Sequence, residues 1–222
     1  MLTDRAVEFC RLPEGSRVLD VGCGVGATVN RLREKYRLEA FGLDSSAGLL
    51  MEGLHRNPGI PVVQAAACSL PVRDGKLAAI FCECVLSLAS DRRVVLREFH
   101  KTLRPGGRVV LTDLYARSPE HLSALRSLSV RSCLSGAVAK SVLVDDIRDS
   151  GFRVLLWEDH SALLKEFAVR LIFAGCSLQS LFGGTCARPV GPGEPPAASK
   201  ARPGYYLLIA EKAEPEAPRL RG

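Results

Sequence analysis

Short apolar runs alternate with stretches of helical periodicity along the first half of the chain. In residues 91–103, for example, Val95 and Phe99 recur at helical spacing and fall on one side. The predicted strands cover residues 17–21, 39–44, 61–66, 77–82 and 108–112, and the predicted helices cover 26–36, 46–56 and 91–103. Apolar strands that alternate with helices are typical of a parallel sheet covered on both faces, so we predict an α/β fold.

The second half is less regular. The pattern predicts helices over 118–134, 141–150 and 161–182, and strands over 152–157 and 205–210. A stretch rich in Gly, Pro and Ala separates the last helix from the last strand and has no apolar period, which predicts a flexible loop at about 183–204. With no repeat and no second core, we expect a single domain over 1–222, with helical cap segments at about 118–150 and 160–182.

Composition narrows the class of protein. Hydrophobic residues make up 47% and charged residues 24%, as in ordinary globular proteins, and no apolar run is long enough to cross a bilayer. The first turns carry Asp4, Arg5 and Glu8, unlike a signal peptide, so we expect a cytoplasmic protein with no membrane partner. The eight cysteines are then expected to be reduced thiols.

The net charge and the cysteine spacing limit the kinds of partner that we expect. The net charge of +6 is spread along the chain and only 6% of residues are aromatic, which argues against a nucleic-acid partner. No Cys-x-x-Cys pair occurs, so we assign no metal ion. A small-molecule substrate is the remaining expectation, and the oligomeric state stays open.

The segment 18–26, Val-Leu-Asp-Val-Gly-Cys-Gly-Val-Gly, is the most informative. Gly22, Gly24 and Gly26 allow a tight strand-to-helix turn and the close approach of a ligand, and the following helix points free N–H groups at that turn. Asp44, at the end of the second strand, is placed to accept hydrogen bonds from ribose hydroxyls. Together these features predict a cofactor that carries a nucleoside.

The identity of the cofactor is a closer question. Gly22, Gly24 and Ala27 also satisfy the dinucleotide fingerprint, so an NAD-dependent oxidoreductase is the alternative. Asp20, two residues before the first glycine, suits the ammonium of a methionine moiety and offers nothing to a pyrophosphate. The turn at 103–107 has no part in the dinucleotide rule. Both features favour S-adenosylmethionine.

These residues resemble the class I S-adenosylmethionine-dependent methyltransferases, and most closely the small-molecule type of ubiquinone and menaquinone biosynthesis. The matching segments are Leu-Asp-Val-Gly-Cys-Gly-Val-Gly at 19–26, Gly-Leu-Asp at 42–44, Ser-Leu-Pro at 69–71, and Leu-Arg-Glu at 96–98 running through Leu-Arg-Pro-Gly-Gly-Arg-Val-Val at 103–110. The resemblance implies a Rossmann-like, seven-stranded, mostly parallel sheet with helices on both faces and an antiparallel last strand at 205–210. It also implies methyl transfer to a small-molecule acceptor.

The resemblance further implies that Gly22, Cys23 and Gly24 line the methionine and ribose moieties and that Asp44 holds the ribose. The predicted cofactor-binding residues are Asp20, Gly22, Cys23, Gly24, Asp44, Ser45, Ala67 and Cys82.

The chain departs from the family pattern at two places. Before Leu70, where the family carries an aspartate that contacts the adenine amino group, this chain has the stretch 64–67, Gln-Ala-Ala-Ala. The usual Phe-Asp at the fourth strand is replaced by Leu77 and Ala78. The backbone N–H near Ala67 is left to meet the adenine. Because carboxylates are missing, a non-catalytic S-adenosylmethionine-binding protein is a second alternative.

Methyl transfer depends on in-line alignment in a dry pocket, and an alcohol or phenol acceptor also needs a general base. Glu83, which follows the fourth strand, is the predicted catalytic base, and a solvated or capping carboxylate is its alternative interpretation.

The cysteines suggest a different acceptor. Cys68, Cys82 and Cys84 are expected near the mouth of the sheet, and Cys176 and Cys186 flank the late loop. Thiolates bind soft ions, and arsenite methyltransferases are similar in using dispersed cysteines, so a thiol or metalloid acceptor is a further alternative. Against it, free cysteines are often simply small buried hydrophobes.

Overall fold

The computed structural model of the chain describes residues 1–123, 132–174 and 202–213. Its strands are β1 (Arg17–Val21), β2 (Glu39–Asp44), β3 (Val62–Gln64), β4 (Leu77–Glu83), β5 (Leu103–Ala116), β6 (Phe152–Asp159) and β7 (Pro203–Lys212). Its α-helices are α1 (Leu2–Cys10), α2 (Ala27–Tyr36), α3 (Ala47–Arg56), α4 (Arg92–Thr102), α6 (Lys140–Asp149) and α7 (Ser161–Phe173). Short 3-10 helices are η1 (Leu86–Leu88) and η2 (Pro119–His121).

The seven strands form one sheet in the order β3-β2-β1-β4-β5-β7-β6. Neighbouring strands from β3 to β5 are parallel, whereas β7 runs antiparallel to both β5 and β6. The predicted mostly parallel sheet with an antiparallel last strand is therefore confirmed. From β1 the chain continues to β2 on one side, and β4 lies on the other, so the strand order reverses between β1 and β4.

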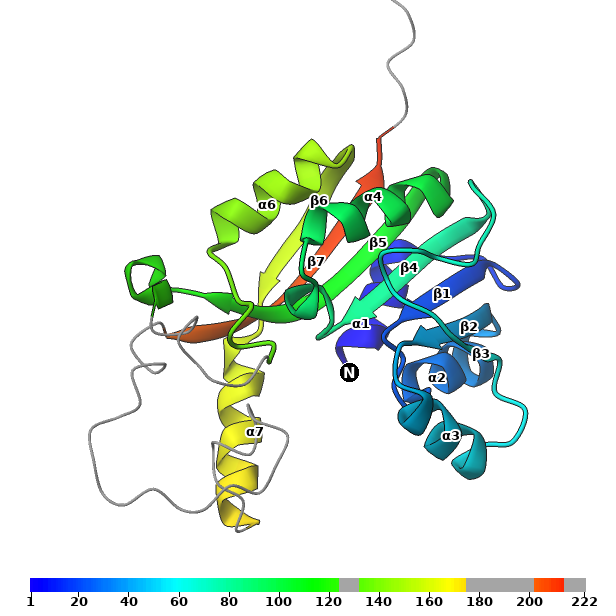
Figure 1. Cartoon of the computed structure of the whole chain (residues 1–222), viewed down its shortest axis with the longest axis horizontal. Helices are drawn as coiled ribbons and strands as arrows, with labels where there is room; N and C mark the ends of the chain where they lie inside the picture. Colours follow the sequence, from blue (N-terminus) through cyan, green and yellow to red (C-terminus); the bar gives the residue numbers. More distant parts are fainter. Residues whose placement is uncertain (124–131, 175–201, 214–222) are drawn as a thin grey trace, which may run out of the picture.

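Helices cover both faces of the sheet (Figure 1). On the face seen in front, Phe99 of α4 and Ile147 of α6 are fully buried against the sheet. On the opposite face, Val7 of α1 and Leu32 of α2 belong to a second buried cluster. This two-sided burial explains why the central strands are apolar at nearly every position.

The N-terminal helix α1 is an element that the sequence analysis did not predict. Its buried residues Thr3, Ala6, Val7 and Cys10 have the spacing of one helical face, and α1 packs on β5 and β7. The signal was present, but we used this segment only to exclude a signal peptide.

The strand β5 also differs from the prediction, because it begins at Leu103 and not at residue 108. Leu77 of β4 pairs with Leu103 and Ala79 pairs with Arg108, so the four residues 104–107, Arg-Pro-Gly-Gly, lie opposite a single residue of β4 and form a bulge inside the strand. Gly106, with φ 67°, supplies the left-handed backbone that this bulge needs.

The predicted cap segments are only partly described. Helix α6 packs against β6 and α4, and residues 124–131 lie outside the described residues. Helix α7 is described to Phe173, and the rest of its predicted span to 182 lies beyond residue 174, where the description stops. The predicted loop at 183–204 also lies outside up to residue 201; Arg202 is described, and Pro203 and Gly204 already belong to β7. The single domain and its caps stay predictions. In the described ranges, no helix combines the length and apolarity of a membrane span.

Asp4 ties α1 to α2. Its carboxylate accepts hydrogen bonds from Arg31 Nε and Nη2 at 2.7 and 2.6 Å and from the Tyr36 hydroxyl at 2.7 Å, and Lys35 Nζ lies 3.2 Å away. The Arg31 guanidinium, followed by the Tyr36 hydroxyl, holds the pKa of Asp4 well below its usual range. Its stabilising effect is therefore present above the unfolded-state pKa and is lost as the pH falls toward the lower folded value.

We predict that Asp4→Asn lowers the free energy of unfolding at pH 7 by about 1–2 kcal/mol, because it removes a charged acceptor at a partly exposed site. Urea unfolding should show this loss, and the loss should shrink as the pH falls below 3.8, the ordinary value for aspartate. The control is Glu39→Gln, because Glu39 forms an exposed ion pair with Arg17. This change should alter stability by less than about 0.5 kcal/mol. Equal effects of Asp4→Asn and Glu39→Gln would contradict the prediction.

Candidate active site

The turn between β1 and α2 is fixed by backbone hydrogen bonds to the end of β2. The N–H groups of Gly22 and Cys23 both donate to the Leu43 carbonyl, at 2.7 and 3.0 Å. Gly22 and Gly24 have φ 75° and 53°, in the left-handed region that favours glycine. The sequence therefore needs glycine here to bend the chain directly after a buried strand.

Asp44 holds the same turn from the end of β2. Its Oδ2 accepts a hydrogen bond from the Gly24 N–H at 2.9 Å, and its Oδ1 accepts one from the Ser46 N–H at 2.8 Å. A carboxylate has about four lone-pair positions, so two further hydrogen bonds remain possible for this group. The predicted ribose-binding residue is thus oriented by the turn that it was predicted to face.

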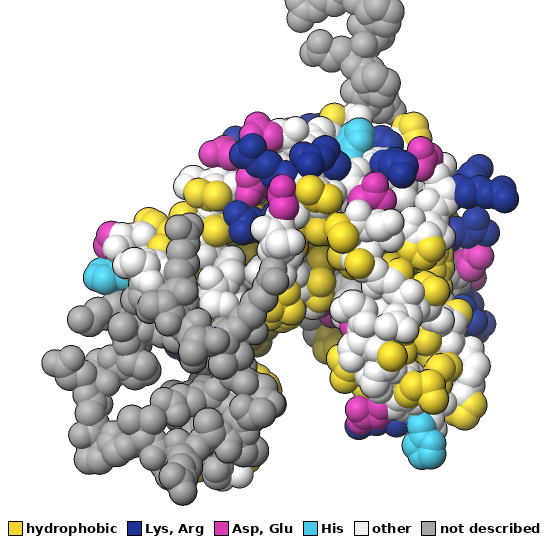
Figure 2. Space-filling view, viewed as in Figure 1, with side chains coloured by type: hydrophobic (Ala, Val, Ile, Leu, Met, Phe, Trp, Pro, Cys, Tyr) yellow, Lys and Arg dark blue, Asp and Glu magenta, His cyan; other side chains and the backbone are white. Residues whose placement is uncertain are grey.

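A cleft of about 490 Å³ opens beside this turn. It lies at the carboxyl ends of β1, β2 and β4, and the strand order reverses between β1 and β4, which is the usual ligand site of such sheets. Its lining residues are Val21, Gly22, Leu43, Asp44, Ser45, Ala65, Ala66, Ala67, Cys68, Val85, Leu88, Ala89, Ser90, Asp91, Val94 and Val95. Figure 2 shows hydrophobic side chains gathered near the middle of the described surface on the face in view.

The predicted cofactor residues divide between this cleft and its supports. Those that line the cleft are Gly22, Asp44, Ser45 and Ala67. Gly24 is joined to the cleft through Asp44. Cys23 and Cys82 are buried at 9% and 1% exposure, and Cys82 belongs to the core cluster that contains Leu111. Burial raises the pKa of Cys23 to about 12 and raises that of Cys82, which fits thiols that pack as small hydrophobes.

Asp20 and Glu83 gather with Asp44 around the turn. Asp20 is 3% exposed and makes no side-chain hydrogen bond within the described residues. Burial, followed by the negative charges of Glu83 and Asp44, raises the pKa of Asp20 well above its usual value. In the described part of the chain, no lysine or arginine forms an ion pair with any of the three. The turn thus gathers three carboxyl groups without a cation from the described residues, and their proximity disfavours full ionisation.

Glu83 is held by two helices. Its Oε1 accepts a hydrogen bond from the Thr3 hydroxyl at 2.9 Å, and its Oε2 accepts one from the Thr28 hydroxyl at 3.1 Å. These contacts connect the end of β4 to α1 and α2. The carboxylate that we predicted as the catalytic base therefore lies beside the glycine-rich turn, with a fixed orientation.

Sequence reasoning missed one wall of the cleft. Residues 88–91, with Val85 and Val94, form this wall after β4, and Asp91 also caps α4 by accepting a hydrogen bond from the Arg93 N–H at 2.8 Å. The available signal was the Ala-Ser-Asp run directly before a helical pattern, which is typical of a helix start at a sheet edge.

Comparisons with known proteins agree with this geometry. Residues 19–111 match the family described as "Methyltransferase domain", a segment that contains the turn, Asp44 and Glu83. This matched segment, less than half of the chain, is similar to a methyltransferase domain. The predicted family and its Rossmann-like fold are confirmed.

Several relatives share the fold or part of the sequence. Phosphoethanolamine N-methyltransferase 1 of Arabidopsis thaliana is 29% identical over 163 residues, which are 72% of this chain and 33% of that protein. Demethylmenaquinone methyltransferase of Beutenbergia cavernae is 29% identical over 185 residues, 78% of this chain and 72% of that protein. The solved structure of geranyl diphosphate C-methyltransferase from Streptomyces coelicolor A3(2) has a TM-score of 0.72 at 15% identity, covering 96% of this chain and 78% of that one. The chain spans a third or less of the plant relatives that it matches.

The methyltransferase domain depends on the space beside Gly22. A Cβ atom added at Gly22 would overlap Val85 Cγ2, whereas one added at Gly24 meets open space, although both glycines have positive φ. We predict that Gly24→Ala costs about 1–2 kcal/mol of stability from backbone strain alone, and that Gly22→Ala costs more. In urea unfolding, Val85→Ala should recover part of the Gly22→Ala loss and none of the Gly24→Ala loss. Equal rescue of both would show that the overlap is not the cause.

Proposed function

We propose that this chain is an S-adenosylmethionine-dependent methyltransferase that acts on a small-molecule acceptor. The observation that carries the proposal is the group of three carboxylates, Asp20, Asp44 and Glu83, around a glycine-rich turn with no cationic partner among the described residues. S-adenosylmethionine has an ammonium and a sulfonium, so it supplies the positive charge that this site lacks.

The same charge disfavours the NAD alternative. A dinucleotide places an anionic pyrophosphate at the glycine-rich turn, next to the helix N-terminus. Here that turn already contains the Asp44 carboxylate, which would repel an anion. Charge complementarity therefore supports the sulfonium cofactor over the dinucleotide.

Different residues of the cleft are proposed to bind different parts of the cofactor. Asp44 is proposed to hold the ribose, since the turn leaves lone pairs of its carboxylate free. Ser45 and the 65–68 backbone would face the adenosine moiety along one wall, and the apolar side chains of Val85 and Leu88 would exclude water on the other. When bound, the cofactor supplies an electrophilic methyl group. The chain aligns it and keeps the pocket dry.

Glu83 remains the proposed catalytic base. Its support is its place at the end of β4, next to the carboxylates of the turn, and the two hydroxyl donors that orient it. The remaining proposed contacts, Cys23, Gly24 and Cys82, would act through backbone position, because both thiols are buried.

A cytoplasmic location and a single domain over 1–222 complete the proposal. The six cysteines that the structure describes as free fit a reducing compartment. The seven strands of the described residues form one sheet, which fits one domain.

The test uses the full chain, S-adenosylhomocysteine and a metabolite extract. We expect calorimetric binding of S-adenosylhomocysteine, no binding of NAD, and label transfer from methyl-labelled S-adenosylmethionine to a small molecule. Glu83→Gln should lower label transfer by about 100-fold or more if Glu83 is the base, while binding stays. Binding without any transfer would select the non-catalytic alternative, and binding of NAD alone would overturn the proposal.

Asp20 gives a second, independent prediction. Because its pKa is raised, Asp20 contributes stability at low pH that is lost as the pH rises through the folded value. Asp20→Asn should therefore stabilise the free protein at pH 7 by about 0.5–2 kcal/mol, with a gain that shrinks as the pH falls to 3.8. The same change should weaken S-adenosylhomocysteine binding about tenfold or more, because it removes a charged acceptor.

The matched control for Asp20→Asn is Asp74→Asn, which changes a carboxylate that is 67% exposed. It should alter neither stability nor binding. Tighter or unchanged binding in Asp20→Asn would show that Asp20 does not serve the cofactor.

A further inference from the structure

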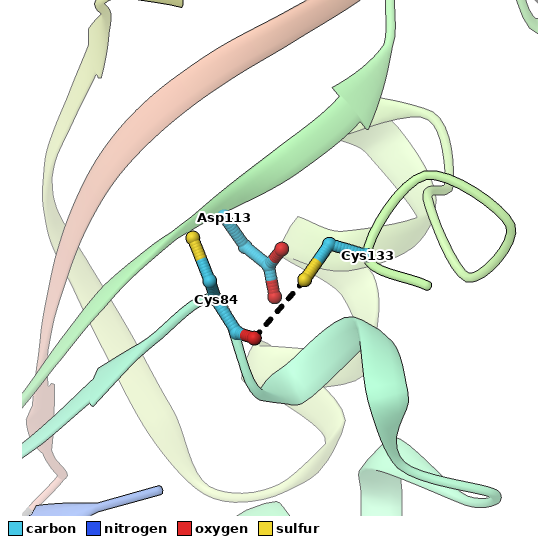
Figure 3. A group of neighbouring side chains, drawn as sticks. All are labelled: Cys84, Asp113 and Cys133. Carbon is cyan, nitrogen blue, oxygen red and sulfur yellow. Dashed lines mark hydrogen bonds between the residues drawn. The ribbon is translucent and has the colours of Figure 1, made fainter. Parts of the chain in front are cut away.

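Two thiols and a buried carboxylate meet where β4 and β5 end. The Sγ atoms of Cys84 and Cys133 and a carboxylate oxygen of Asp113 all lie within 4.8 Å of one another (Figure 3). Within residues 1–123, 132–174 and 202–213, this is the one group of three His, Cys, Asp or Glu side chains close enough to share an ion. Sequence analysis did not find it, because Cys133 is 49 residues from Cys84.

Cys84 is fixed at this place by the backbone. It follows the last residue of β4 with φ 57°, a left-handed conformation that is uncommon outside glycine. Its N–H donates to the Thr112 carbonyl of β5 at 2.7 Å, and its Sγ lies 3.4 Å from the Tyr205 hydroxyl of β7. The thiol therefore has a defined position next to Val85, a residue of the cofactor cleft.

Asp113 supplies negative charge to the pair. Its carboxylate, drawn between the two cysteines in Figure 3, is 2% exposed and accepts hydrogen bonds from the Ser87 hydroxyl, the Ser87 N–H and the Leu114 N–H at 2.8 to 2.9 Å. Burial raises the pKa of Asp113 to about 6, and the hydrogen bonds from Ser87 and Leu114 act in the opposite direction. No lysine or arginine in the described ranges forms an ion pair with it.

Cys133 reaches the group from a turn. The turn is closed by a hydrogen bond from the Ser132 N–H to Ser135 Oγ at 2.8 Å, and Cys133 Sγ donates to the Cys84 carbonyl at 3.1 Å. The neighbouring thiol and burial raise the pKa of Cys84. The arrangement is a preformed dithiol and not a pair of separated hydrophobic side chains.

We propose that Cys84 and Cys133 bind a soft, thiophilic ion between their sulfurs, with Asp113 as the oxygen neighbour. Thiolates select soft ions over hard ones. Metal–sulfur bonds of about 2.3 Å require sulfurs roughly 4 Å apart, so the group needs only a small closure. The inference goes beyond methyl transfer and does not depend on it.

Two kinds of thiophilic ion bind thiols in this way, a soft dication and a trivalent metalloid. A soft dication such as Cd²⁺ forms two metal–sulfur bonds and releases the two thiol protons to solvent. The two thiolates balance its charge, and Asp113 is the oxygen neighbour. A trivalent metalloid hydroxide such as arsenite forms two As–S bonds while two As–OH bonds break. The two hydroxyls leave as water with the thiol protons, and arsenic stays trivalent.

The test measures protection of each thiol in the reduced full chain. The protein is alkylated with iodoacetamide with and without CdCl₂ or sodium arsenite, and each cysteine peptide is quantified by mass spectrometry. We expect Cys84 and Cys133 to be protected together, and the exposed Cys68 to react equally in all samples. Calorimetry should show one ion per chain.

Variants locate the site. Cys84→Ser or Cys133→Ser should weaken ion binding by more than about 100-fold, since even partners outside the ligand set change affinity about 10–100-fold. Cys68→Ser is the matched control and should bind normally. Asp113→Asn should weaken Cd²⁺ more than arsenite, which separates the two kinds of ion. Should Cys84→Ser not fold, Cys133→Ser alone carries the test. Unprotected Cys84 with both ions, or binding that survives Cys133→Ser, overturns the proposal.

Discussion

The hydrogen bond from the Gly24 N–H to the Asp44 carboxylate is the interaction on which the site depends. Together with the two backbone bonds to the Leu43 carbonyl, it joins the bend after β1 to the end of β2. The parallel register of β1 and β2 places Asp20 opposite Gly42, directly below this bend. Once the strands pair in this register, Asp20 and Asp44 lie near the same turn, and the pairing of β4 with β1 adds Glu83.

That arrangement conflicts with stability of the free protein, and the conflict is informative. A buried carboxylate with negative neighbours and no cation raises its own pKa and disfavours the folded state at neutral pH, as Asp20 does. Sequences that are otherwise consistent with their fold break such rules where a ligand compensates. Other carboxylates of the structure have partners: Asp4 is paired with cations, and Asp113 accepts three hydrogen bonds. Asp20, in contrast, has neither a cation nor a hydrogen-bond donor among the described residues.

The features that could be predicted from the sequence depend on residues that lie close together in the chain. The bend at Gly22 and the acidic end of β2 are readable because glycine spacing and strand endings are short-range signals. Hydrophobic periodicity predicts the alternation of strands and helices, and this alternation predicts the mostly parallel sheet. Contacts between distant segments could not be predicted. The Thr3–Glu83 bond spans 80 residues and the Cys133–Cys84 bond spans 49, and both follow from tertiary packing that no local pattern encodes. The bulge in β5 was hidden for a similar reason, because Pro-Gly-Gly is typical of a turn as well as of a bulge.

Glu83 and Cys84 are neighbours in sequence, but they contact different parts of the structure. The Glu83 carboxylate meets hydroxyls from α1 and α2, whereas the Cys84 thiol meets Tyr205 of β7 and the turn that carries Cys133. The left-handed backbone at Cys84 marks the point where the chain leaves β4 between the two. A cationic cofactor at the glycine-rich turn and a thiophilic ion at the cysteines would then use different donor atoms, carboxylate oxygen on one side and sulfur on the other. Because ligand softness separates those two chemistries, the end of one strand can support both without competition for the same ligand.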